Sequence, residues 1–123
     1  MLQVENNIIF LTKGDEGVLP VDVTIQGGTA YEMGESDFLT LSVRRLPSAD
    51  SPLLMRAQSN PGSNRIIIPA EATAEMEPGK YSADIQLTDA SGKPYTIWPD
   101  NTEVKPDGNR SFDNFYLTPE VTI

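Results

Sequence analysis

One stretch, Met76 to Ile97, constrains the fold of this chain more than any other. After the pair Pro78-Gly79, apolar and polar residues alternate strictly from Tyr81 to Thr88. Alternation with a period of two is typical of a β-strand that buries one face and exposes the other. The loop Asp89–Lys93 contains glycine, and the apolar run Tyr95–Trp98 follows it. This order predicts a β-hairpin at the centre of an all-β domain, opened by a type II turn at Pro78-Gly79.

Further short runs of the same kind are spread along the chain, and turn residues separate them. Ten prolines and nine glycines punctuate the sequence, which is the pattern of short strands joined by turns. Pro20 indicates an edge strand or the start of a strand, and Pro119 a bend in the last one. In chain order, we expect strands at Asn7–Thr12, Leu19–Gln26, Phe38–Arg44, Leu53–Gln58, Arg65–Ile68 and Phe115–Ile123, with a short strand or loop at Thr29–Met33.

Only one segment, Ala70–Met76, favours a helix. It is long enough for about two turns, and isolated helices of that length are marginal. We therefore expect at most one short helical turn near residues 70–76. Seven to eight short antiparallel strands with almost no helix predict an immunoglobulin-like β-sandwich, and a small barrel is the alternative. The 123 residues fit a single domain that spans residues 1–123.

Composition excludes several classes of function. The chain has no cysteine and no histidine, so it lacks a disulfide framework, a thiolate nucleophile and the usual general base near neutral pH. Its formal net charge of −9 should repel nucleic acids and anionic membranes. No apolar run reaches the roughly 20 residues of a membrane helix. The first residues show no secretory signal, so we expect none.

Acidic residues are the only abundant groups with catalytic potential. A glycosidase needs two carboxylates that face each other across a cleft, but the spacing selects no such pair and Asp84 stands alone on its strand. Neither a serine–lysine pair beside a base nor a phosphate-binding glycine loop is present. We therefore expect no enzyme, no catalytic site and no cofactor. The residues weighed were Glu32, Glu35, Asp37, Glu71, Glu75, Glu77, Ser63, Ser91, Lys93, Gly27, Gly28 and Pro61–Ser63.

The longest polar stretch, Pro99–Asn114, allows a calcium hypothesis. Hard cations take carboxylate and amide oxygens, but the regular spacing of a calcium loop is absent and the same residues are common in turns. We favour an ordinary loop with no metal. Asn109-Arg110-Ser111 matches a glycosylation sequon that we interpret as a chance tripeptide. The oxygen donors are Asp100, Asn101, Glu103, Asp107, Asn109 and Asp113.

Aromatic residues near the end of the chain allow a second hypothesis, a sugar-binding platform. Single aromatic residues in strands are more often packed in a core. We therefore favour core positions and keep a carbohydrate-binding accessory module as the alternative function. The residues in question are Tyr95, Trp98, Phe112, Phe115 and Tyr116.

The stretch "MEPGKYSADIQLTDASGKPYTI" also carries a family pattern. The stretch resembles the pattern found in the amino-terminal domain of phage baseplate upper proteins and in related tail-fibre-anchoring domains of phages of Gram-positive bacteria. That pattern consists of a Pro/Gly-Gly turn, a run Tyr-x-x-Asp-Ile-x-Leu-Thr-Asp, a Gly-Lys turn and a final Tyr-Thr. The segments "FLTKGDEGVLPVDVTI", "DFLTLSVRRLPSADSPLLMRA" and "LTPEVTI" resemble other strands of that domain. The matching residues of the first stretch are Pro78, Gly79, Lys80, Tyr81, Asp84, Ile85, Gln86, Leu87, Thr88, Asp89, Gly92, Lys93, Tyr95 and Thr96.

The resemblance implies an attachment role rather than a reaction. It implies a non-enzymatic structural module of a phage or prophage tail, made in the bacterial cytoplasm and built into the virion. Its expected partners are other tail or baseplate proteins, bound through an edge strand or a sheet face, and symmetric copies imply a homo-oligomer. We expect neither nucleic acid nor membrane as a partner.

Overall fold

The computed structural model describes residues 2–5, 8–25, 29–45, 51–98 and 114–119. The predicted all-β fold is confirmed, and the short helical turn is the 3-10 turn η1, Ala70–Thr73. Within those ranges, no helix is long and apolar enough to span a membrane. The strands are β1 Leu2–Glu5, β2 Ile8–Thr12, β3 Gly17–Pro20, β4 Thr24–Ile25, β5 Thr29–Ala30, β6 Phe38–Arg44, β7 Leu53–Ser59, β8 Arg65–Ile68, β9 Gly79–Thr88, β10 Pro94–Trp98 and β11 Phe115–Thr118.

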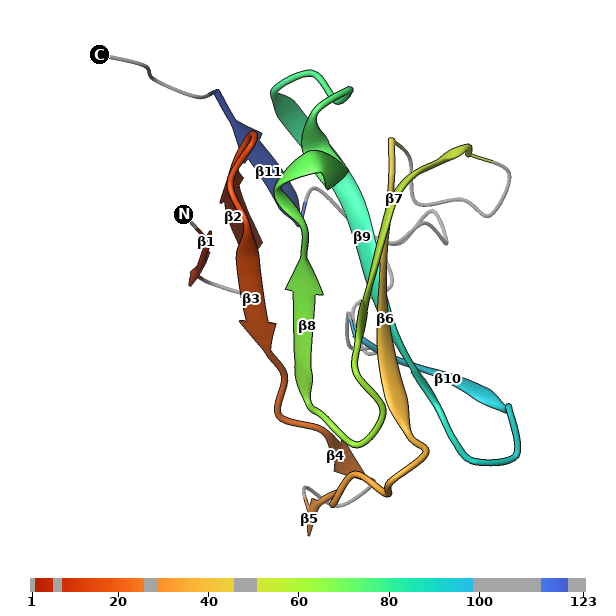
Figure 1. Ribbon diagram of the computed structural model, residues 1–123. Coiled ribbons are helices and arrows are strands. Elements are labelled where there is room, and N and C mark those ends of the chain that lie inside the picture. Colours follow the sequence, from red (N-terminus) through yellow and green to blue (C-terminus); the bar gives the residue numbers. More distant parts are fainter. Residues whose placement is uncertain (1, 6–7, 26–28, 46–50, 99–113, 120–123) are drawn as a thin grey trace, which may run out of the picture.

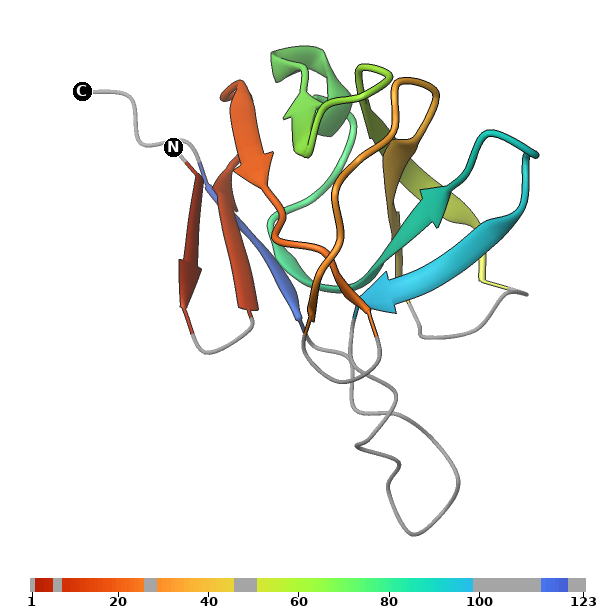
Figure 2. The same ribbon diagram turned by 90° about the horizontal axis from the view of Figure 1, so that it is seen from below.

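Nine of the described strands form one continuous sheet that folds into two facing layers, and β4 and β5 pair in a separate two-stranded sheet (Figures 1 and 2). One layer has the order β1-β2-β11-β9-β6-β7, and the other consists of β8 and β3. Strand β7 joins them, because it pairs with β6 from Leu53 to Gln58 and with β8 at Gln58 and Ser59. This arrangement places the strands as in an immunoglobulin-like sandwich.

The sheet almost closes on itself, which brings it near the small barrel that the sequence left as an alternative. Strand β3, at one end of the strand order, passes beside β1, at the other end. The approach is close enough that a Cβ on Gly17 would lie 2.9 Å from the Cδ1 of Leu2. A larger residue at this position would have to displace the side chain of Leu2.

The hairpin predicted at the centre of the domain is present as β9 and β10. Strand β9 pairs with β6, β10 and β11, and its inward residues follow the predicted alternation. The hydroxyl of Tyr81, at the start of β9, donates a hydrogen bond to the backbone oxygen of Glu77. This contact has the geometry of the tyrosine corner of immunoglobulin-like domains. It fixes the chain where it enters β9, and the sequence pattern alone did not show it.

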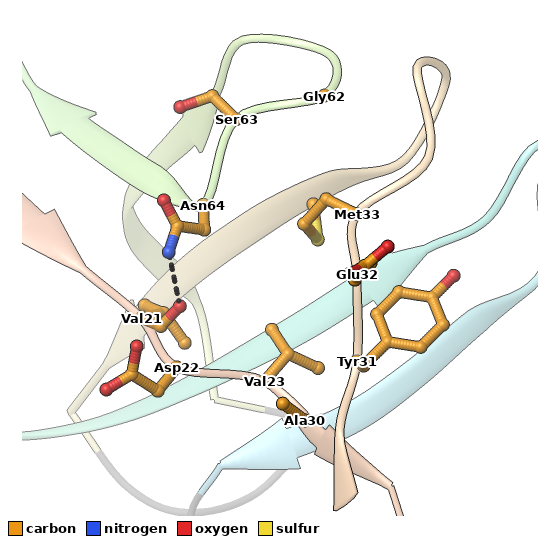
Figure 3. Close-up of a pocket in the computed structure, with 10 residues that line it drawn as sticks. All are labelled: Val21, Asp22, Val23, Ala30, Tyr31, Glu32, Met33, Gly62, Ser63 and Asn64. Atoms are coloured by element: carbon orange, nitrogen blue, oxygen red, sulfur yellow. Dashed lines mark hydrogen bonds between the residues drawn. The ribbon is translucent and has the colours of Figure 1, made fainter.

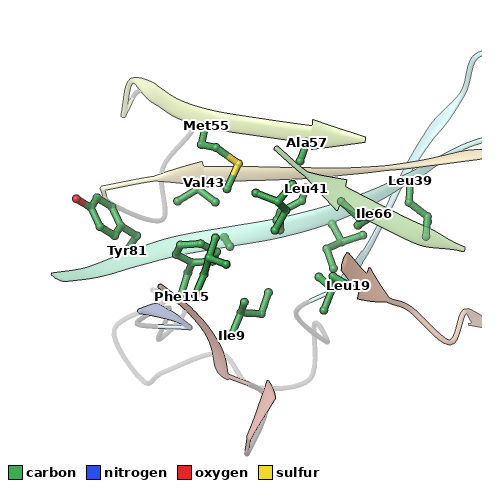
Figure 4. Packing of buried hydrophobic residues seen from close by; sticks show 14 of the residues in the cluster. Ile9, Leu19, Leu39, Leu41, Val43, Met55, Ala57, Ile66, Tyr81 and Phe115 are labelled. Carbon is green, nitrogen blue, oxygen red and sulfur yellow. The ribbon is translucent and has the colours of Figure 1, made fainter. Parts of the chain in front are cut away.

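The core lies between the two layers and is aliphatic apart from two aromatic rings (Figure 4). The predicted inward residues of β6 and β9 are all buried. Tyr81 and Phe115 fill the end near β11, and both are at most 1% exposed. The fully buried side chains are Ile9, Leu11, Leu39, Leu41, Val43, Ile66, Ile68, Thr73, Tyr81 and Phe115.

Strands β10 and β11 lie along the same edge of β9, opposite β6. Strand β11 pairs with β9 from Gly79 to Tyr81, and β10 pairs with it from Ile85 to Thr88. The two strands therefore act as halves of one strand, and residues 99–113 are inserted between them in the sequence. Asn114 precedes β11 and contacts β9 at Ala83, in the interval between the two halves.

The observed strands differ from the expected ones in three places. The run Leu19–Gln26 is divided, because β3 ends at Pro20 and β4 begins at Thr24. Proline lacks a backbone donor. The next amide, on Val21, donates to the oxygen of Asn64 at 2.9 Å, in register with the β3–β8 pairs but just outside both strands. Strand β1 was not predicted. Strand β11 ends at Thr118, and residues 120–123 lie outside the described ranges.

The expected type II turn at Pro78-Gly79 is also not observed. The central glycine of such a turn has a φ near +80°, whereas Gly79 has a φ of +153° and is already part of β9. Glycine is still favoured at that value, because other residues rarely adopt it.

Candidate functional site

Three loops gather at one end of the sandwich, the lower end in Figure 1. They are the connection from β3 to β6, the turn from β7 to β8 at residues 60–64, and the hairpin loop Asp89–Lys93. Immunoglobulin-like folds often use the loops at one end of the sandwich for binding. We call this region the loop end.

Backbone and side-chain hydrogen bonds tie two of these loops together. The side-chain amide of Asn64 donates to the oxygen of Val21 at 3.2 Å, and the amide of Val21 donates back to the oxygen of Asn64. The amide of Tyr31 donates to the oxygen of Val23 at 2.8 Å. These bonds extend the β3–β8 and β4–β5 pairs by one residue each and give the loops a defined shape.

Asp37 organises the same region from a buried position, at 4% exposure. Its Oδ2 accepts hydrogen bonds from the hydroxyl of Tyr31 at 2.6 Å and from the amide of Gly34 at 2.8 Å. Its backbone oxygen accepts a bond from the amide of Gly62 at 2.7 Å. The hydrogen bond to Asp37, followed by burial, raises the pKa of Tyr31. This carboxylate is therefore occupied in building the loops.

A pocket of about 440 Å³ lies between the two tied loops (Figure 3). Its wall combines apolar side chains such as Val23 and Met33 with the carboxylates of Asp22 and Glu32 and the amide of Asn64. Polar and apolar groups contribute about equally to this wall, and the polar groups can orient a bound molecule. Its two carboxylates favour a basic or hydroxyl-bearing group over an anionic one.

The hairpin loop beside the pocket is held by Asp89. Its Oδ1 accepts hydrogen bonds from the hydroxyl of Ser91 at 2.6 Å and from the amides of Ser91 and Lys93 at 3.0 and 3.1 Å. These bonds, with the Ser91 hydroxyl first, lower the pKa of Asp89. The Nζ of Lys93 lies 5.4 Å from the ring centre of Tyr95. The exposed ring of Tyr95, in β10, therefore has the ammonium group of Lys93 over its face.

Asp84 lies away from the loop end, on the outer face of the layer that contains β9. The register places it beside Ser42 of β6, and Ser42 is also opposite Arg56 of β7. Burial raises the pKa of Asp84, and the positive charge of Arg44 partly offsets that rise. Within the described ranges, neither the Oδ1 of Asp84 nor the Nε of Arg44 has a hydrogen-bond partner. The predicted lone carboxylate therefore has a cationic neighbour that the sequence did not show.

The other residues weighed as catalytic candidates occupy turns or exposed positions. Ser63 accepts a hydrogen bond from the amide of Arg65, and Ser91 donates one to Asp89. Glu71, Glu75 and Glu77 are exposed on and after η1, as are Glu32 and Glu35 at the loop end. Gly27 and Gly28 lie outside the described residues. Among the described residues, no two of these carboxylates share a hydrogen-bonded group.

The aromatic residues are separated rather than gathered in a platform. Phe115 is in the core, as favoured. Tyr116 faces outward and packs edge-on against Phe10, with ring centres 5.1 Å apart. Tyr95 is 43% exposed and pairs with Leu87, whose side chain points inward, so it lies on the other side of the layer from Tyr116. Phe112 and the side chain of Trp98 lie outside the described residues.

The calcium and glycosylation hypotheses concern residues 100–113, which also lie outside the described ranges. Among the described residues, no group of three or more potential metal ligands is present. Comparison of the chain with protein-family models, curated proteins and solved structures gives no match. The phage resemblance therefore remains a prediction from the residues that carry it.

Proposed function

We propose that this chain is a non-enzymatic attachment module of a phage or prophage tail, and that it acts through contacts with other tail or baseplate proteins. The proposal combines the confirmed all-β fold with the resemblance of the hairpin to tail-fibre-anchoring domains. In this role the sandwich is built into the virion in symmetric copies.

The observation that carries the proposal is the free edge of β7. One edge of β7 pairs with β6 from Leu53 to Gln58. No described strand pairs with its other edge between Leu53 and Ala57, although η1, which follows β8, lies near β7. Leu53 and Leu54 are each 41% exposed at the start of this edge. Unpaired backbone groups beside exposed apolar side chains favour the addition of a partner strand.

Mass spectrometry of purified phage or induced prophage particles tests the tail role. We expect the chain in the particles at a stoichiometry that matches tail symmetry, and we expect it to retain neighbouring tail proteins in a pull-down. A charge on the free edge, as in Leu54→Asp, should abolish that retention. Its matched control is Ile67→Asp, on the outer face of β8, where the side chain is 37% exposed. Absence of the chain from the particles refutes the role.

A second candidate function, carbohydrate binding, has one observation in its favour. Tyr95 is 43% exposed next to the loop-end pocket, and exposed aromatic rings beside polar groups are suited to stacking on sugars. A glycan array with the unmodified chain and with Tyr95→Ala tests it. Hits that Tyr95→Ala removes and Tyr116→Ala keeps support this function, and an array without hits refutes it.

A further inference from the structure

A second cavity, of about 340 Å³, opens at the lower end of the space between the layers. Its wall is aliphatic, with Ile9 of β2, Leu19 of β3 and Ile85 of β9 among the buried residues that line it. Val4 of β1 and Ile97 of β10 complete the side toward solvent, and Val4 is 50% exposed. A core that leaves this much aliphatic surface unfilled loses packing and hydrophobic stabilisation.

The sheet has an open position at the same place. Strand β2 pairs with β11, and β1 pairs with the other edge of β2, but no described strand pairs with the free edge of β10. The cavity reaches from Val4 and Ile9 on one side of this position to Ile85 and Ile97 on the other. An unpaired strand edge and an unfilled aliphatic cavity therefore coincide.

We propose that this position is a slot for one extended strand of a partner protein. The partner strand pairs with the free edge of β10 and places alternate aliphatic side chains in the cavity. Strand addition of this kind draws affinity from backbone hydrogen bonds and specificity from side-chain pockets. The inference rests on the proposed attachment role, because it names the kind of segment that a tail partner supplies.

Charge defines the partner strand further. Asp22 is the charged residue in the cavity wall, and its side chain is exposed. The chain as a whole carries a net charge of −9, which attracts a basic partner and repels an acidic one. The occupant is therefore an extended segment with valine or isoleucine at every second position and with lysine or arginine beside them.

Synthetic peptides test the slot directly. The probe is the blocked peptide KTVTITVK, and the control is KTSTSTSK, which has the same length and charge but no aliphatic side chains. Isothermal titration with the full chain should show binding of the probe, and binding of the control at least about tenfold weaker. Hydrogen exchange should slow at the amides of β10 in the presence of the probe. No binding of the probe overturns the inference.

Two valines provide a matched pair of variants. Val4 is 50% exposed and lines the cavity, whereas Val18 is 45% exposed on β3 and does not line it. Both positions accept aspartate without loss of the core, because their side chains already contact solvent. Val4→Asp should weaken binding of the probe about tenfold, and Val18→Asp should leave it within about twofold. Equal effects of the two substitutions overturn the slot.

A charge reversal tests the role of Asp22. In Asp22→Lys the preference should change from KTVTITVK to the acidic peptide ETVTITVE. An unchanged preference overturns the assignment of a basic partner. The particle experiment remains independent of these measurements. If the chain is present in particles but does not bind the probe, the tail role is supported and the slot is refuted. If the chain binds the probe but is absent from particles, the slot is supported and the tail role is refuted.

Discussion

The side-chain amide of Asn114 takes the place of a neighbouring strand beside Ala83. Its Oδ1 accepts a hydrogen bond from the amide of Ala83 at 2.7 Å, and its Nδ2 donates one to the oxygen of Ala83 at 2.9 Å. The backbone oxygen of Asn114 also accepts a bond from the amide of Ile9 at 2.8 Å. One residue therefore joins β2, β9 and β11 at the point where the strand beside β9 is interrupted.

Removal of this amide should be costly. Asn114 is 6% exposed, so Asn114→Ala leaves two buried backbone groups of Ala83 without partners and should lower the free energy of unfolding by about 2–4 kcal/mol. Urea denaturation measures the change. The control is Asn64→Ala, which removes one exposed hydrogen bond and should cost less than about 1 kcal/mol. Similar losses for the two variants would contradict the role of Asn114.

The tyrosine corner gives a second prediction. Tyr81→Phe keeps the buried ring and removes only the hydroxyl that donates to Glu77, so it should lower the free energy of unfolding by about 1 kcal/mol. Tyr116→Phe is the comparison, because that ring contacts Phe10 on the outer face, and its effect should stay within about 0.5 kcal/mol. Thermal or urea unfolding distinguishes the two variants. If Tyr81→Phe leaves the free energy of unfolding unchanged, the tyrosine corner does not stabilise the fold.

Tyr31 should ionise later than an ordinary tyrosine. Its hydrogen bond to Asp37, followed by burial, raises its pKa above the ordinary 10.0. The stability from the neutral hydroxyl is complete below pH 10 and is lost as the pH rises through the folded-state pKa. In an absorbance titration, Asp37→Asn should shift one tyrosine to lower pH, and Tyr31→Phe should remove that tyrosine from the curve. A curve that Asp37→Asn leaves unchanged rejects the coupling.

Asp84 should make the protein less stable as the pH rises. Burial raises the pKa of Asp84 above 3.8, although Arg44 opposes the rise. Between the unfolded and folded pKa values the folded chain binds more protons, so stability falls as the pH rises through that window. Because Asp84 is only half-buried, Asp84→Asn should raise Tm at pH 7 by only about 2 °C, with no difference below about pH 3. A lower Tm at pH 7 would show that the attraction of Arg44 dominates.

The sequence predicts the parts of this fold that depend on local periodicity. Alternation placed Leu39, Leu41 and Val43 in the core, and all three are 0% exposed. It did not predict that Thr40 and Ser42, on the outer face of the same strand, are each only 8% exposed. That burial comes from neighbours across the sheet, such as Arg56 and Asp84 beside Ser42. Contacts across the sheet do not appear in the spacing of a single strand.

The candidate site was harder to predict for the same reason. Turn residues indicated loops at residues 59–64 and 89–93, but nothing local indicated that Asn64 contacts Val21 or that Asp37 binds Tyr31 and Gly62. The local sequence around a buried carboxylate in a loop looks the same as that around a solvent-exposed one. The division of one strand into β10 and β11 was also hidden, because residues that pair with the same edge of β9 are separated by residues 99–113.

The divided strand also makes the chain suited to circular permutation. Leu2 of β1 pairs with Leu11 of β2, which pairs in turn with Leu117 of β11. Two interstrand spacings, about 10 Å in total, separate the two ends of the folded body. A short linker can join them, and new ends can be opened between Trp98, the last residue of β10, and Asn114, which precedes β11. Such a permutation changes the order of the strands along the sequence and keeps their order in the sheet.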